Sequence, residues 1–101
     1  MAETAVMADV VIVDNRDFWR VEAQVGGKVA GFAAYRDKHG RRVFTHTEVD
    51  PAFEGQGIGS TLARAALDKA RADGVGVVPQ CPFIRGWIDK HPDYADLVVP
   101  D

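Results

Sequence analysis

The segment Glu54–Ser60, which reads Glu-Gly-Gln-Gly-Ile-Gly-Ser, constrains this chain most, because it leads into a stretch with clear helical periodicity. The apolar residues that share one side of the helical projection are Ile58, Leu62, Ala63, Ala66, Leu67 and Ala70. We expect an amphipathic helix that ends near Gly74. The first turn of a helix leaves backbone N–H groups unpaired, and glycine lets an anion approach them closely. The sequence therefore predicts an anion site, with a flexible turn as the alternative, because short glycine patterns also occur by chance.

Two well-known phosphate-binding loops do not fit this segment. The Rossmann fingerprint requires a further glycine and, about 20 residues later, an acidic residue on a second strand, but that position lies at or beyond the expected helix end. The P-loop requires a lysine followed by serine or threonine at the helix start, and no lysine occurs there.

Four stretches before the glycine segment have the composition or alternation of strands: 10–13, 18–25, 28–36 and 41–49. Gly26 and Gly27 supply a two-residue hairpin turn, and three successive strands with short turns predict an antiparallel meander. After the helix, residues 75–78 read as a short buried strand and residues 82–91 as a second helix that stops before Pro92. The expected fold class is α+β, a mostly antiparallel mixed sheet flanked by two helices.

Composition limits the classes of protein to consider. The 101 residues, 47% hydrophobic and 27% charged, predict one soluble globular domain over residues 1–101. The net charge of −3 argues against nucleic-acid binding. The single cysteine, Cys81, rules out an internal disulfide, and no zinc-ligand spacing occurs, so we expect no metal. Met1–Ala8 does not resemble a signal peptide, and no run approaches the roughly 20 apolar residues of a membrane span, so we expect a cytoplasmic protein. We expect a monomer or a weak homodimer, and the sequence does not decide between them.

Four short segments together resemble the small GNAT-like N-acetyltransferase family, a truncated branch of the GNAT superfamily. They are His46-Thr47-Glu48-Val49, Gln56-Gly57-Ile58-Gly59, Cys81-Pro82-Phe83-Ile84 and His91-Pro92-Asp93-Tyr94. The similarity extends from Trp19 to Val98. It implies an acetyl-coenzyme A binding domain that lacks the two early helices of most GNAT proteins, and hence an open groove for the acceptor.

The resemblance also implies which residues hold the coenzyme. The backbone N–H groups expected to bind its pyrophosphate belong to Gly55, Gln56, Gly57, Ile58, Gly59 and Ser60. Glu54 departs from the family consensus, which has Gln or Arg there, and its carboxylate is expected to point away from the phosphates. The strand before the loop is expected to separate from the next one, so that backbone groups near Val49 pair with the pantetheine arm.

Acetyl transfer to an amine requires a group that accepts the amine proton and a group that protonates the leaving thiolate. Alternation places His46, Glu48 and Phe44 on one face of their strand, so either His46 or Glu48 can be the base. The alternative is that His46 only forms hydrogen bonds within the sheet and that Glu48 is merely exposed. Many GNAT enzymes use a tyrosine as the acid, but Trp87 matches that position and Tyr94 comes later.

Cys81 lies between a strand end and a helix start, a setting that favours a thiolate nucleophile. We interpret it as lying beside the coenzyme sulfur, where it takes the acetyl group transiently or contacts it; a packed, unreactive thiol is the alternative. Arg85 is a candidate for binding the coenzyme phosphates, against the alternative of a solvated helix face. Five aromatic residues are expected in the core, namely Trp19, Phe32, Phe44, Phe53 and Phe83.

Three functions remain open on these observations. The first is an acyltransferase that moves acetyl from acetyl-coenzyme A to a primary amine of a small molecule or a protein. The second is a non-catalytic acyl-coenzyme A binding module, which the missing tyrosine favours. The third is an interaction domain in which the glycine segment is only a turn.

Overall fold

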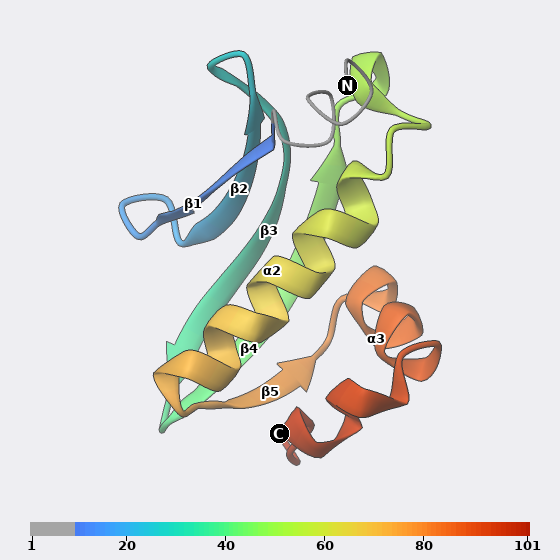
Figure 1. Cartoon of the computed structure of the whole chain (residues 1–101). Coiled ribbons are helices and arrows are strands. Elements are labelled where there is room, and N and C mark those ends of the chain that lie inside the picture. The colour runs from blue at the N-terminus through green and yellow to red at the C-terminus, as the bar shows by residue number, and fades with distance from the viewer. Residues whose placement is uncertain (1–9) are drawn as a thin grey trace.

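The computed structural model describes residues 10–101, so the expectation about Met1–Ala8 lies outside the described range. One five-stranded sheet runs through the molecule in the order β1-β2-β3-β4-β5 (Figure 1). The strands are β1 (Val10–Asn15), β2 (Arg20–Val25), β3 (Lys28–Lys38), β4 (Arg41–Val49) and β5 (Gly76–Pro79). The first four pair antiparallel, and β5 pairs parallel to β4. The predicted α+β class and the mostly antiparallel mixed sheet are confirmed.

The helices are α2 (Ile58–Asp73), α3 (Pro82–Asp89) and two short 3-10 helices, η1 (Pro51–Phe53) and η2 (Pro92–Leu97). Gly74 ends α2 in the left-handed conformation, as predicted. The prediction that the second helix reaches His91 was wrong, because Lys90 already closes the helix and Pro92 has no N–H to continue it. No helix within residues 10–101 is long and apolar enough to cross a membrane.

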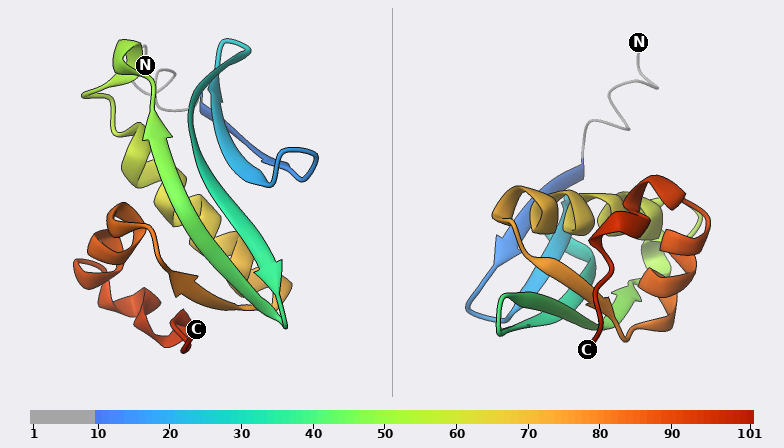
Figure 2. Two further views of the ribbon diagram at one scale, coloured as in Figure 1. Left: turned by 180° about the vertical axis from the view of Figure 1, so that it is seen from behind. Right: turned by 90° about the horizontal axis from the view of Figure 1, so that it is seen from below.

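The core lies between α2 and one face of the sheet. The apolar residues predicted on one side of α2 are all buried there. α3 and η2 lie beside α2, at the β5 edge of the sheet (Figure 2). Seen from behind, the sheet itself faces the viewer, and within residues 10–101 no helix covers this face (Figure 2). We call it the open face; it carries the residues of β2, β3 and β4 that point away from α2.

A β-bulge in β4 changes which side chains share a face. Tyr35 pairs with Phe44 and Ala34 with His46, so Thr45 is an extra residue without a partner on β3. Phe44 is fully buried on the α2 side, whereas His46 and Glu48 point to the open face. The prediction that Phe44 shares a face with His46 and Glu48 was therefore wrong, because strict alternation assumes a strand without a bulge.

The aromatic residues are less buried than predicted. Only Phe44 of the five lies fully in the core. Phe32 and Phe53 are half-buried, and Trp19, in a turn with a positive φ, is 36% exposed. Phe83 is 43% exposed and lies beside the start of α2, so it is part of the surface around the glycine segment.

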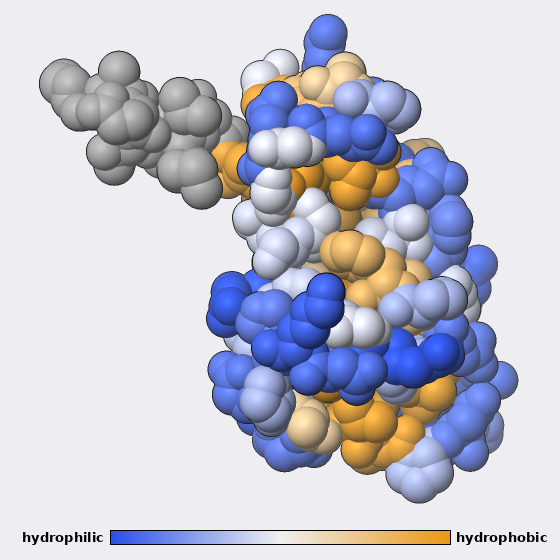
Figure 3. All heavy atoms as spheres, turned by 90° about the vertical axis from the view of Figure 1, so that its right-hand side faces the viewer, coloured by the Kyte–Doolittle hydropathy of each residue, from blue (hydrophilic) through white to orange (hydrophobic). Residues whose placement is uncertain are grey.

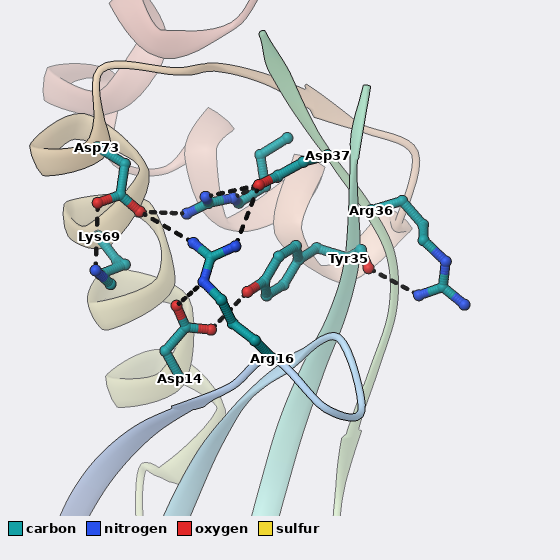
Figure 4. Close-up of polar contacts among 8 residues, drawn as sticks. Asp14, Arg16, Tyr35, Arg36, Asp37, Lys69 and Asp73 are labelled. Carbon is teal, nitrogen blue, oxygen red and sulfur yellow. Dashed lines mark hydrogen bonds and ion pairs between the residues drawn. The ribbon is translucent and has the colours of Figure 1, made fainter. Parts of the chain in front are cut away.

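A buried arginine joins the sheet to the end of α2. Arg42, only 2% exposed, donates from Nε and Nη2 to the two carboxylate oxygens of Asp37 at 2.8 and 3.1 Å. Its Nη1 donates to Asp73 Oδ2 at 3.0 Å. Tyr35 donates to Asp14 beside it, and Arg16 closes the cluster (Figure 4). These contacts fix α2 against the sheet at its C-terminal end, far along the helix from the glycine segment.

Candidate active site

The start of α2 presents a row of unpaired amides. Gly55 and Gly57 have φ of +84° and +75°, a left-handed conformation that glycine adopts without strain. Among residues 10–101, no side chain caps α2, and the amides of residues 55–60 have no acceptor within hydrogen-bond distance. The amide that follows this row, that of Thr61, donates to Gly57 O at 3.0 Å. Unpaired amides and the positive end of the helix dipole together make a site suited to an anion.

Two side chains from α3 border these amides. A Cβ placed on Gly59 would lie 3.0 Å from Cζ of Phe83, so the ring packs directly on the helix start. Trp87 donates from Nε1 to Ser60 Oγ at 2.9 Å. Ser60 accepts this bond and keeps its own hydroxyl hydrogen for another acceptor. Figure 3 shows the right-hand side of the view in Figure 1, where patches of hydrophobic residues adjoin patches of hydrophilic residues.

β4 and β5 separate at the middle of β4. Pairing ends at Phe44 and Pro79, and the last contact is Cys81 N donating to Phe44 O at 2.9 Å. Beyond that point, within residues 10–101, the side of β4 that faces β5 has no strand partner through Val49. The separation that the resemblance implied is therefore present, and it opens toward the glycine segment that follows β4.

Cys81 lies where the two strands part. Its thiol is buried, 3% exposed, and Sγ donates to Thr47 Oγ1 at 3.3 Å. Thr47 points to the α2 side of β4, the same side as Cys81. Sequence reasoning did not single out Thr47, and its only signal was its place between the two candidate bases.

His46 and Glu48 lie together on the opposite face of β4. His46 Nε2 is 2.9 Å from Glu48 Oε2, and the two side chains are 59% and 62% exposed. A carboxylate only accepts, so Nε2 carries the hydrogen and Nδ1 of the neutral ring is the free basic nitrogen. Because β4 is unpaired on its β5 side here, a ligand at this edge can meet Cys81 from one face and the His46–Glu48 pair from the other.

The remaining candidates lie away from the unpaired amides. Arg85 is exposed and donates from Nη2 to Gln80 O at 3.2 Å; within the described part of the chain, no hydrogen bond joins it to residues 55–60. Tyr94 donates to Asp68 at 2.7 Å and accepts from Arg64 at 3.1 Å. The bond to Asp68 raises the pKa of Tyr94, which makes the phenol a poorer proton donor.

A polar network on the open face was not foreseen as a site. Glu22 is on this face but only 3% exposed, because it accepts hydrogen bonds from Asn15, Arg20 and Gln24 at 3.1, 2.7 and 3.0 Å. Burial alone would raise the pKa of Glu22, but these bonds outweigh it and lower the pKa. The alternation of Arg20, Glu22 and Gln24 indicated an outward face and gave no sign of burial.

A cleft of about 290 Å³ opens beside this network. It lies over the paired residues of the first half of β3 and the end of β4, and it is lined by Arg20, Val29, Ala30, Gly31, Phe32, Glu48, Val49, Asp50 and Pro51. No group of three or more His, Cys, Asp or Glu side chains arranged to hold a metal ion occurs in residues 10–101.

Comparison with known proteins identifies the family. Residues 20–97 match the family model described as GCN5-related N-acetyl-transferase. This match extends over more than half of the sequence, and the chain belongs to the GCN5-related N-acetyltransferase family. No curated protein is significantly similar to it in sequence.

Solved structures agree with this fold. A GCN5-like protein from Staphylococcus aureus, studied by NMR in solution, superimposes with a TM-score of 0.70 and 21% identity over 94% of this chain and 93% of its own. A ribosomal-protein-alanine N-acetyltransferase from Brucella melitensis biovar Abortus 2308 gives a TM-score of 0.54 and 25% identity. That alignment covers 81% of this chain and 62% of the Brucella chain. The sheet and helices described above are thus a GNAT fold.

Proposed function

We propose that this protein is an N-acetyltransferase that moves an acetyl group from acetyl-coenzyme A to a primary amine. The observation that carries the proposal is the row of unpaired amides at residues 55–60, which follows the unpaired half of β4 after the short helix η1. An elongated ligand with a diphosphate at one end and a thioester at the other fits these two adjoining features. Family membership supports the same activity.

In this proposal the coenzyme follows the free edge of β4. The backbone N–H groups of Gly55, Gln56, Gly57, Ile58, Gly59 and Ser60 bind the pyrophosphate. The hydroxyl of Ser60, oriented by Trp87, donates to a phosphate oxygen. Val49 and the β4 backbone before it pair with the pantetheine amides. Arg85 reaches the coenzyme only if its contact with Gln80 is given up.

The transfer itself needs one base and one proton for the thiolate. The ammonium group of the acceptor first gives one proton to solvent. The neutral nitrogen then attacks the acetyl carbonyl carbon and the carbon–sulfur bond breaks, which leaves the new amide nitrogen with one proton too many. His46 accepts this extra proton at Nδ1, and Glu48 stabilises the resulting charged ring through its contact with Nε2. The coenzyme thiolate takes a proton from solvent, because Trp87 cannot supply one and Tyr94 is bound to Asp68 and Arg64.

Cys81 is assigned a contact role beside the coenzyme sulfur. Its burial and its hydrogen bond to Thr47 support contact over a covalent relay, since a relay requires the thiolate to attack the thioester. The small thiol leaves room where the two strands part, and a larger side chain there would close the opening.

Thermal unfolding with and without coenzyme tests the binding half of the proposal. Coenzyme A at about 100 times its dissociation constant should add about 2.7 kcal/mol to the free energy of unfolding. Pantetheine, which lacks the pyrophosphate together with the 3′-phosphoadenosine, is the control and should add much less at the same concentration. Equal effects of the two compounds, or none from either at millimolar concentration, would contradict the assigned phosphate site.

Release of free thiol from acetyl-coenzyme A in the presence of amines tests the catalytic half. We expect release that depends on the amine and that falls at least tenfold in His46→Gln, by the usual contribution of general base catalysis. A second function, a non-catalytic acyl-coenzyme A binding module, is favoured by the bonded state of Tyr94. Tight binding of coenzyme A without thiol release on any amine would support that second function.

A further inference from the structure

The cleft on the open face combines a positive and a negative group on opposite walls. Glu22, Phe32 and Glu48 lie in one row across β2, β3 and β4, because Glu22 pairs with Phe32 and Phe32 with Glu48. The guanidinium carbon of Arg20 lies 4.5 Å from the centre of the Phe32 ring. The Arg20 and Glu48 side chains therefore flank the same aromatic ring, and all three line the cleft.

Arg20 is held in place and keeps donors free. Its Nε donates to the buried carboxylate of Glu22 at 2.7 Å, and Asn15 and Gln24 hold that carboxylate from two further directions. Within residues 10–101, the two terminal nitrogens of Arg20 have no acceptor at hydrogen-bond distance. A fixed guanidinium with two free donors side by side matches the two oxygens of a carboxylate.

The opposite wall suits an amine. Glu48 lines the cleft and contacts His46 at the free edge of β4. Asp50 also lines the cleft, but its Oδ1 accepts from Ala52 N at 2.9 Å as the cap of η1. Neighbouring strands are about 4.8 Å apart, so the backbones of β2 and β4 are about 10 Å apart. A ligand that reaches both walls needs several bonds between its carboxylate and its amine, and its apolar part would lie against Phe32 and Val29.

We propose that this cleft is the acceptor site and that it binds a small zwitterionic amine, with the acceptor's carboxylate on Arg20 and its amine beside Glu48 and His46. This proposal rests on the proposed acetyl transfer and adds the substrate class to it. The orientation follows from the position of the thioester at the free edge of β4, two strands away from Arg20. Glu22 is a positioning residue, because it acts only through Arg20.

Two probes of equal length separate this proposal from amine binding in general. δ-Aminovalerate carries the carboxylate, and pentylamine is its counterpart without it; four methylenes keep the two amines similar in basicity. In the wild-type protein kcat/KM should be at least about tenfold higher for δ-aminovalerate, as expected for one charge-assisted hydrogen-bonded pair. Arg20→Gln should abolish this preference. Arg36→Gln, an exposed arginine on β3 that is not part of the cleft, is the matched control and should keep it.

Loss of Arg20 leaves Glu22 without one of its partners, so Arg20→Lys serves as a second variant in case Arg20→Gln folds poorly. The lysine keeps the charge and loses the paired donors, and it should lower the preference for δ-aminovalerate several-fold. Equal kcat/KM for the two amines in the wild-type protein, or an unchanged ratio in both Arg20 variants, would overturn the proposal.

Amide NMR spectra separate failure of the site from failure of the activity. Titration with δ-aminovalerate should shift the signals of Arg20 Nε, Gly31, Phe32 and Glu48, and pentylamine should shift them less. Shifts without acetyl transfer would support the cleft and contradict the proposed activity. Acetyl transfer to both amines without shifts at these residues would support the activity and overturn the acceptor site.

Discussion

Cys81 and Thr47 are joined by a hydrogen bond from Sγ to Oγ1 of 3.3 Å, at the point where β4 and β5 separate. The bond fixes a buried thiol on the α2 side of β4. The proposed base, His46, points to the other side of the same strand. The thioester of a coenzyme at the strand edge would therefore lie between a thiol that contacts it and a base that serves the acceptor.

Replacement of Cys81 by alanine tests whether the thiol contacts the coenzyme or carries the acetyl group. We expect Cys81→Ala to keep turnover within tenfold of the wild type and to lower stability by about 1 kcal/mol through the small cavity it leaves. Intact-mass measurement of the wild-type protein after incubation with acetyl-coenzyme A should show no acetyl adduct. An adduct that forms as fast as turnover, and disappears in Cys81→Ala, would establish a relay instead.

Gly59 is predicted to matter for coenzyme binding more than for folding. In Gly59→Ala the added Cβ would lie 3.0 Å from Phe83 Cζ and push the ring toward the space in front of the amides. We expect coenzyme A to bind about tenfold more weakly, with a small change in stability because alanine favours the helix. Calorimetric titration measures the affinity.

Gly40→Ala is the matched control for this substitution. Gly40 has a φ of +77° in the turn before β4, at the end of the strand far from residues 55–60, and no atom within 4 Å of the added Cβ. The substitution should cost about 1 kcal/mol of stability through backbone strain and leave coenzyme affinity unchanged. Equal affinities in Gly59→Ala and the wild type would contradict the position assigned to the pyrophosphate.

The sequence was enough to predict that the strands exist, that a helix follows the glycine segment, and that this segment lies between a strand and that helix. Alternation of apolar and polar residues indicated β2, composition indicated β3, and the bounds of β4 were predicted to the residue. Composition, alternation and turn residues depend on positions that are close together along the chain, so they can be read from a single sequence. That His46 and Glu48 share a face also followed, since residues two apart on a strand point to the same side.

Features that depend on partners distant in the sequence could not be predicted in the same way. The bulge at Thr45 is set by pairing with β3, and it moved Phe44 away from the face of His46. Glu22 alternates with apolar residues as an outward-facing strand residue does, yet it is buried because three partners converge on it. No local signal marks Arg42, which is buried between two carboxylates. The contact of Phe83 with Gly59 joins two segments that are neighbours only in the folded chain.

Arg42 is predicted to be the most sensitive charged residue for stability. Its side chain is 2% exposed and bound by Asp37 and Asp73, whose pKa values its hydrogen bonds lower. Arg42→Met leaves both carboxylates without this partner and should lower the free energy of unfolding by about 3 kcal/mol, as for other broken buried pairs. Urea unfolding measures the loss. Arg41→Met, one residue away and without an ion pair among residues 10–101, should change stability by less than about 0.5 kcal/mol.

Glu22 should make stability depend on pH in a defined direction. The hydrogen bonds from Arg20, Gln24 and Asn15 outweigh burial and hold the pKa of Glu22 in the folded protein below its ordinary value of 4.5. The unfolded chain therefore takes up a proton first as the pH falls. The stability that the carboxylate contributes is complete above the unfolded pKa and is lost as the pH falls through the lower, folded pKa.

Glu22→Gln isolates this contribution, because it retains the shape and removes the charge. At pH 7 the variant should be less stable by about 1.5–3 kcal/mol, the range for hydrogen bonds to a charged group. The difference should shrink below about pH 4.5, where the wild-type carboxylate begins to be protonated in the unfolded chain. Asp37 and Asp73 also make the protein acid-sensitive, but they are present in both proteins and cancel in the difference. Urea unfolding of both proteins at pH 7 and pH 4 gives the comparison. A difference that stays constant, or grows, on acidification would show that Glu22 is not held ionised by its three donors.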